Sequence, residues 1–368
     1  MSIVTTDKPG FARSVWLVTE REVASKLRSK AFVVSTLLLF AAALAGVIWG
    51  GFAAQSPSET PVAVTAETRA VLDGVPGVAA TVADTPDAAR SLVKAGTVDA
   101  ALVPSSGDGS FGFTLVAKDS VPRGLVALLS VSPPVELLDT GGVDPVLRSF
   151  IAIGFGVVFL LGAATFGSTI ASSVTEEKQT RVVELLISAV PVRALLAGKV
   201  VGNTILAMAQ ILVLAAIAIV GLSVTGQSGV LSALGAPILW FAVFFLFGFV
   251  LLAALFAAAG AMVSRQEDLG STMTPLTMLV MAPYVLVIVF NDNPAVMAVL
   301  SYVPFSAPVG MPMRLYLGDA QWWEPLLSLV ILLITCGLAI LAGARIYRTA
   351  LLRMGARVTL AEALRGRG

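Results

Sequence analysis

The feature that most constrains this chain is a run without any charged residue, which extends from Lys199 to Arg265. About 20 apolar residues in a helix cross the roughly 30 Å hydrocarbon core of a bilayer. The run is therefore too long for one span, and residues 223–237, rich in glycine, serine and proline, predict a turn between two. We expect these spans at residues 200–222 and 238–262.

Composition supports the same class of protein. Hydrophobic residues make up 57% of the chain and charged residues 13%, against about 25% charged residues in soluble domains. Four further apolar runs bring the predicted number of spans to six, at residues 31–53, 150–172, 272–290 and 325–344. The first run is longer than the apolar core of a signal peptide and no clean small-residue cleavage site follows it, so we expect a retained anchor.

Residues 54–147 differ from the rest because charges and prolines return and apolar runs shorten to strand length. Short alternating segments predict strands at residues 60–66, 78–83, 98–103 and 111–117. Between them, Thr85 is a candidate N-cap, Pro86 a first helical residue and Gly96 a terminator, which predicts a helix over residues 85–95. We expect a small α/β domain, whose role the sequence leaves open.

The distribution of Lys and Arg sets the expected orientation. Basic residues gather in the N-terminal segment 1–30, in the connection 175–199 and in the C-terminal tail 345–368, which fall on one side of six spans. By the positive-inside rule this side is the cytoplasm, with the chain in the plasma membrane. The expected fold is an α-helical integral membrane protein with six transmembrane helices and an extracytoplasmic α/β domain after the first span.

Residues 291–324 join the last two spans on the expected outer side. This loop carries several prolines and apolar residues and the pair Trp322 and Trp323. Indole rings favour the membrane interface. We expect a loop anchored there by the two tryptophans, and whether it re-enters the membrane is open.

The connection at residues 175–199, called here the coupling segment, carries charges between two apolar blocks. On a helical wheel Glu177, Arg181 and Glu184 share one face, and apolar side chains occupy the other as far as residue 189. Pro191 would end or kink such a helix. The pattern predicts an amphipathic helix at the bilayer surface. On the wheel alone, a simple interfacial linker and a docking helix are both open.

Particular residues of this segment resemble the signature of ABC type-2 permeases, in the branch that includes the NatB sodium exporter. They are Glu176, Glu177, Lys178, Arg181, Glu184, Leu185, Gly198 and Lys199. The run SYVPFSAPVGMPMR at residues 301–314 is similar to one that such permeases carry before their last span. The resemblance implies that the segment couples to a separate ABC ATPase subunit, which holds ATP and Mg²⁺, and that a second permease copy or a related permease completes the path.

Several chemistries are excluded by the residues present. The chain has no histidine and one cysteine, Cys336, so an ordinary zinc or haem site and a disulfide framework are not expected. The nearest match to a phosphate loop has Arg193 in place of its first glycine and Val200 in place of the Ser or Thr that holds magnesium. We therefore expect no cofactor, no metal, no ATPase motif and no nucleic-acid partner in this chain.

Polar groups inside the predicted spans are few. Asn203 and Gln210 lie seven residues apart on one face of the third span. Hydrogen bonding between helices and lining of a transport path are both open for them. No charged residue falls within the six predicted spans, so a proton- or sodium-driven relay is not expected.

These patterns favour the permease subunit of an exporter that uses a separate ATPase, over two other classes of protein. A membrane-anchored sensor or assembly protein with a ligand-binding α/β domain would need fewer spans and an output domain. A membrane-embedded hydrolase would need a nucleophile and base within its spans, and none is present. The substrate is open among sodium, a drug, a lipid and a peptide.

Overall fold

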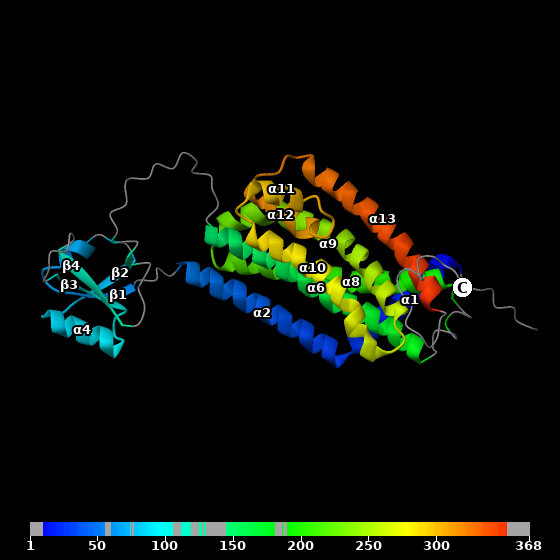
Figure 1. Ribbon diagram of the computed structural model, residues 1–368, viewed down its shortest axis with the longest axis horizontal. Coiled ribbons are helices and arrows are strands. Elements are labelled where there is room, and N and C mark those ends of the chain that lie inside the picture. Colours follow the sequence, from blue (N-terminus) through cyan, green and yellow to red (C-terminus); the bar gives the residue numbers. More distant parts are fainter. Residues whose placement is uncertain are drawn as a thin grey trace, which may run out of the picture. The chain divides into compact units, whose positions relative to one another are not determined.

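The computed structural model describes residues 10–55, 60–73, 75, 77–105, 112–118, 125–126, 129, 145–180, 186 and 190–351. The chain divides into two compact units. The smaller unit comprises Trp49–Thr140, and the larger one comprises Met1–Ile48 and Gly141–Gly368 (Figure 1).

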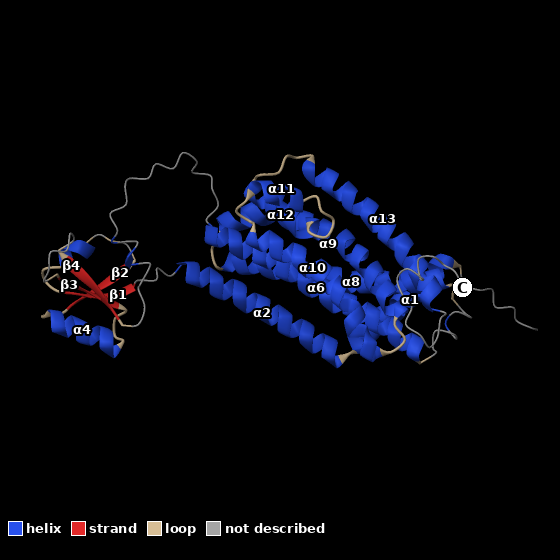
Figure 2. Cartoon of the chain, in the orientation of Figure 1, coloured by secondary structure: helices blue, strands red, loops and turns tan. Residues whose placement is uncertain are grey.

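The smaller unit contains a four-stranded sheet with the strand order β2-β1-β3-β4 (Figure 2). Its described elements are β1 (Thr60–Val64), α3 (Arg69–Leu72), β2 (Val78–Val82), α4 (Pro86–Ala95), β3 (Ala100–Pro104) and β4 (Phe113–Ala117). The strand β1 pairs in parallel with β2 and β3, and β4 pairs antiparallel to β3. A small mixed α/β fold therefore forms where the sequence predicts one.

Alternation along β1 divides the core of this unit between the two faces of the sheet. Val62 and Val64 pack on one face, and Ala63 packs on the other with residues of α4. The predicted caps of α4 form, because the Thr85 side chain accepts a hydrogen bond from the backbone of Ala88 and Gly96 adopts a left-handed φ of 74°.

The larger unit is helical in its described part. Its helices are α1 (Phe11–Arg28), α2 (Lys30–Gln55, which ends within the smaller unit), α6 (Pro145–Gln179), α8 (Val192–Val224), α9 (Ser228–Met262), the 3₁₀ turn η1 (Gln266–Asp268), α10 (Leu269–Val289), α11 (Pro294–Leu300), α12 (Ala307–Leu317) and α13 (Glu324–Leu351). By length and composition, six described helices can cross a membrane.

The helix α9 forms the centre of this unit and packs against α6, α8, α12 and α13. Along one of its faces Phe241, Phe245 and Phe249 follow one another at intervals of four, and rings of α6 pack on them. Near its end the backbone of Gly260 lies against α6 so closely that a Cβ there would collide with the carbonyl oxygen of Ala171. Glycine is thus required at this crossing.

The long helices extend beyond the predicted spans. The turn expected at residues 223–237 is limited to residues 225–227, and Pro237 lies inside α9. The coupling segment is not one separate helix either, because α6 continues to Gln179 and α8 begins at Val192. Continuous helix satisfies backbone groups without water, which favours extension of helices through an apolar bundle.

The predicted loop at residues 291–324 contains the two short helices α11 and α12. Most residues of α12 are buried, and this helix packs on α9 and α6. The Trp322 side chain is 80% exposed, whereas the preceding run is largely enclosed. Pro308, Pro312 and the apolar residues of α12 therefore belong to the core of the unit.

Candidate functional site

The N-terminal helix α1 packs against the start of α8. Its buried residues Ser14, Val18 and Glu22 recur at intervals of four and form one stripe. The stripe meets Gly198, where an added Cβ would lie 2.5 Å from the Cβ of Val18, and Gly202, where it would lie 3.0 Å from the Cβ of Glu22. The glycine pair brings α1 close enough for its polar side chains to reach those of α8.

Four charged side chains from three helices meet beside this contact and form what is called here the charge cluster (Arg21, Glu22, Glu177 and Lys199). The Lys199 ammonium is fully buried and lies 2.9 Å from Glu22 Oε1 and 3.0 Å from Glu177 Oε1. It also donates to Ser173 Oγ at 2.6 Å. The Arg21 guanidinium pairs with both carboxylates from a more exposed position.

The cluster balances two cations against two carboxylates, which is the condition under which ions are tolerated away from water. Burial alone would raise the pKa of Glu22, but the Lys199 ammonium and the Arg21 guanidinium together outweigh burial and hold that pKa below its ordinary value. Glu22 is therefore ionised at neutral pH. The cluster joins α1, the end of α6 and the start of α8 by charged contacts.

A second buried cation attaches the same end of α6 to two other helices. Lys178 Nζ donates to the carbonyl oxygens of Ala261 and Ala350, both at 2.8 Å, near the ends of α9 and α13. One turn earlier, Thr175 Oγ1 donates to Gly260 O at 3.0 Å. A cation at helix C-termini satisfies free carbonyl groups and opposes the negative end of the helix dipole. The end of α6 is thus attached to four other helices.

The structure places the predicted coupling residues in different surroundings. Glu177, Lys178, Gly198 and Lys199 face into the bundle, and only Glu176 among the described ones is exposed. Within the described part of the chain, Glu177 forms ion pairs with Lys199 and Arg21. Three predicted residues, Arg181, Glu184 and Leu185, lie outside the described residues.

The predicted polar residues of the third span lie apart from each other. Asn203 is buried and donates to the carbonyl of Lys199 in its own helix, while its Oδ1 has no hydrogen-bond partner among the described residues. Gln210 lines an otherwise apolar cavity of about 340 Å³ between α2, α6 and α8. Neither makes a side-chain hydrogen bond to another described helix.

The family-like run at residues 301–314 builds a second polar cluster at the other end of the helices. The buried Arg314 guanidinium lies 2.7 Å from Glu324 and donates to Ser301 Oγ at 2.9 Å. Ser328 Oγ donates to Ser301 O at 2.6 Å. These contacts attach α11 and α12 to the start of α13, so this run organises the chain locally.

Sequence reasoning missed α1 and its part in the charge cluster. The available signal was the stripe Ser14, Val18 and Glu22 together with the glycine pair Gly198 and Gly202, whose spacing is typical of close helix contacts. Within the described residues, no group of three or more histidine, cysteine, aspartate or glutamate side chains could hold a metal ion.

Comparisons with known proteins identify relatives and a family of this chain. The chain is 30% identical over 210 residues to the uncharacterized protein YhaP of Bacillus subtilis, covering 54% of this chain and 50% of that protein. It is 24% identical over 223 residues to the uncharacterized protein MJ1024 of Methanocaldococcus jannaschii, covering 60% and 54% respectively. The chain thus matches about half the length of these curated relatives, and no solved structure matches it. The model of the ABC-2 family transporter proteins matches residues 30–345, and the chain therefore belongs to the ABC-2 transporter family.

Proposed function

We propose that this chain is the membrane-spanning permease subunit of an ATP-driven exporter and that a separate ABC ATPase, which holds ATP and Mg²⁺, supplies the energy. Membership of the ABC-2 family supports a permease component. Lys199 is also buried, and its ammonium already contacts two carboxylates and a serine hydroxyl, so it has no free N–H donor for a nucleotide phosphate. The chain would take its energy from its partner.

The observation that carries the coupling proposal is the ion pair between Glu177 and Lys199. These residues stand on either side of the connection between α6 and α8, and their side chains lie 3.0 Å apart. A force applied to the connection therefore acts on both helices together. Through Glu22 the same force reaches α1, and through Lys178 it reaches the ends of α9 and α13.

In this mechanism the ATPase docks on the coupling segment and biases the bundle between two states. ATP binding shifts the equilibrium because the closed form of the ATPase pair binds ATP better than the open form. Glu184, Arg181 and Leu185 are the proposed docking residues. Glu177, Lys178 and Lys199 would transmit the movement from inside the bundle and would not contact the partner.

We further propose that both termini and the connection after α6 are cytoplasmic, in the plasma membrane, and that the smaller α/β unit lies outside. The basic flanks of the helices support this orientation. Two permease chains, identical or related, would form the outward path, with Asn203 and Gln210 as candidate lining residues. Sodium, a drug or a lipid would each suit the proposed exporter.

The experiment is a pull-down of the candidate ATPase with the purified chain, followed by measurement of ATP hydrolysis. Glu184→Arg would place a positive charge where the partner expects a negative one, and such a mismatch costs several kcal/mol. We expect binding to weaken at least about tenfold, since 1.4 kcal/mol is one decade. The matched control is Glu67→Arg, at an exposed residue of the smaller unit.

Two results would contradict the proposal. Equal partner binding and ATP hydrolysis by Glu184→Arg, Glu67→Arg and the parent would remove the docking role of Glu184. Hydrolysis of ATP by the chain purified alone would overturn the assignment as a permease without its own ATPase.

A further inference from the structure

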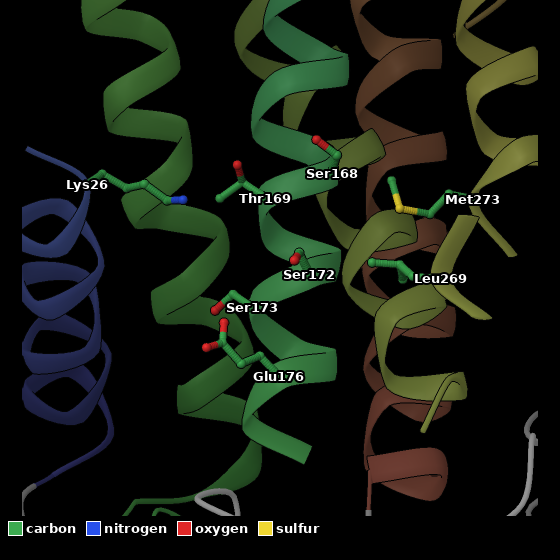
Figure 3. Close-up of a pocket in the computed structure, with 8 residues that line it drawn as sticks. All are labelled: Lys26, Ser168, Thr169, Ser172, Ser173, Glu176, Leu269 and Met273. Atoms are coloured by element: carbon green, nitrogen blue, oxygen red, sulfur yellow. The ribbon is translucent and has the colours of Figure 1, made fainter. Parts of the chain in front are cut away.

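A polar pocket of about 400 Å³ lies between α1, α6 and the start of α10 (Figure 3). Its lining residues are Lys26, Ser168, Thr169, Ser172, Ser173, Glu176, Leu269 and Met273. The hydroxyl residues occupy two successive turns of α6, and Figure 3 shows Thr169 and Ser173 on the side that faces Lys26. Several polar groups gathered at a helix junction need an explanation, because apolar side chains would pack there at a lower free-energy cost.

The pocket offers free hydrogen-bond donors. Within the described part of the chain, the Thr169 hydroxyl has no side-chain hydrogen bond. Ser173 accepts a hydrogen bond from Lys199, so its own O–H remains available to donate. Donors of this kind suit an acceptor-rich group such as a phosphate.

Two opposite charges, Lys26 and Glu176, also line the pocket without forming an ion pair with each other. Among the described residues, neither the Lys26 ammonium nor the Glu176 carboxylate makes an ion pair or a side-chain hydrogen bond. Burial lowers the pKa of Lys26 in its half-buried position, and the nearby carboxylates of Glu22 and Glu176 offset this shift only in part. A ligand with one negative and one positive group would supply a partner to each.

The pocket lies where a membrane surface is expected. Lys26 precedes by four residues the candidate span that begins at Lys30, and Leu269 and Met273 belong to the first turns of α10. Only 11% of the apolar part of the candidate span that contains α10 is buried in the structure, so most of its surface is free to contact lipid. Leu269 and Met273 give the pocket an apolar wall beside its polar one.

We propose that this pocket binds the headgroup of a phospholipid with a primary amine, as in phosphatidylethanolamine. The phosphate would lie on Lys26 and the hydroxyls of Thr169 and Ser173, and the lipid ammonium on Glu176. Because Ser173 also contacts Lys199, the bound lipid would be connected to the charge cluster. This inference holds whether or not the chain works with an ATPase.

The test is native mass spectrometry of the full chain after purification from nanodiscs with equal parts phosphatidylethanolamine, phosphatidylcholine and phosphatidylglycerol. The parent should retain phosphatidylethanolamine in preference to both others, because choline cannot donate hydrogen bonds to Glu176 and phosphatidylglycerol lacks the ammonium. Lys26→Ala should retain it about ten- to hundredfold less, the equivalent of one charge-assisted hydrogen bond. The matched control is Lys30→Ala, at an exposed lysine four residues later in the chain, which should behave like the parent.

Glu176→Gln gives a second test, which depends on selectivity. Removal of this exposed carboxylate should shift the preference from phosphatidylethanolamine toward phosphatidylglycerol while the chain stays folded. Equal retention of the three lipids by the parent would overturn the proposal without any variant. If soluble glycerophosphoethanolamine, in the absence of lipid, binds as tightly as phosphatidylethanolamine does, the assignment to a membrane lipid is overturned.

Discussion

Replacement of Lys199 by methionine tests the charge cluster most sharply. Methionine keeps much of the length of lysine and removes the ammonium, which leaves Glu22 and Glu177 buried with Arg21 as their remaining cation. Removing one partner of a buried ion pair costs about 3–5 kcal/mol. Since the Arg21 side chain is 44% exposed and compensates in part, we expect a loss near the lower end, about 3 kcal/mol.

The measurement is reversible unfolding of the purified chain in mixed micelles with increasing SDS. Lys30→Met serves as the control, because this lysine is exposed at the start of α2 and should change the free energy of unfolding by less than about 0.5 kcal/mol. Addition of Glu22→Gln to Lys199→Met should restore part of the loss, since it removes an uncompensated buried carboxylate. The double-mutant cycle should therefore show coupling of about 1 kcal/mol or more.

The reasoning is refuted if Lys199→Met unfolds like Lys30→Met. It is equally refuted if the effects of the two substitutions at the cluster simply add. Either result would mean that the contacts of Lys199 contribute nothing specific to the attachment of α1 to α8.

Three further predictions follow from the same structure. Ser91→Cys and Glu267→Cys, each as the single cysteine of the chain, should react with an impermeant thiol reagent from opposite sides of the membrane; reaction from one side would contradict the proposed topology. Folding lowers the pKa of Glu22, so the ionised carboxylate contributes its full stability above the ordinary pKa of 4.5, and this contribution is lost as the pH falls below that value. The difference in melting temperature between the parent and Glu22→Gln should therefore narrow in acid. A constant difference from pH 7 to pH 3 would count against the pairing. Gly198→Ala should cost about 1–3 kcal/mol by separating α1 from α8, whereas Gly229→Ala, with no atom within 4 Å of the added Cβ, should not; equal unfolding curves would argue against the close contact.

The existence of the long helices could be predicted from the sequence because uncharged apolar runs of this length have few alternatives. The caps of α4 were equally legible, since Thr85 and Gly96 act on their own neighbours in the chain. The buried surroundings of Lys178 and Lys199 could not be predicted in this way. A helical wheel treats residues 175–189 as a surface helix, whereas in the structure residues 175–179 are the last turn of α6 and Lys178 points into the bundle.

The charge cluster lies beyond local patterns for a related reason. Glu22 and Lys199 are 177 positions apart in the chain, and nothing near either residue indicates its partner. The sequence predicts a polar and basic N-terminal segment because its charged residues are numerous. The few residues of its buried stripe do not stand out among them. Only the matching glycine pair on α8 reveals that this stripe has a partner.

The most direct test of the central claim is photo-crosslinking from the coupling segment in intact cells. A benzophenone amino acid at Glu184 should crosslink to a protein that mass spectrometry identifies as an ABC ATPase, and the same group at Glu67 should not. The crosslink should also change in yield when ATP is depleted, because the docked partner changes state. If no ATPase is captured from Glu184, Arg181 or Leu185, or if Glu67 captures it equally well, the segment does not couple this chain to an ATPase.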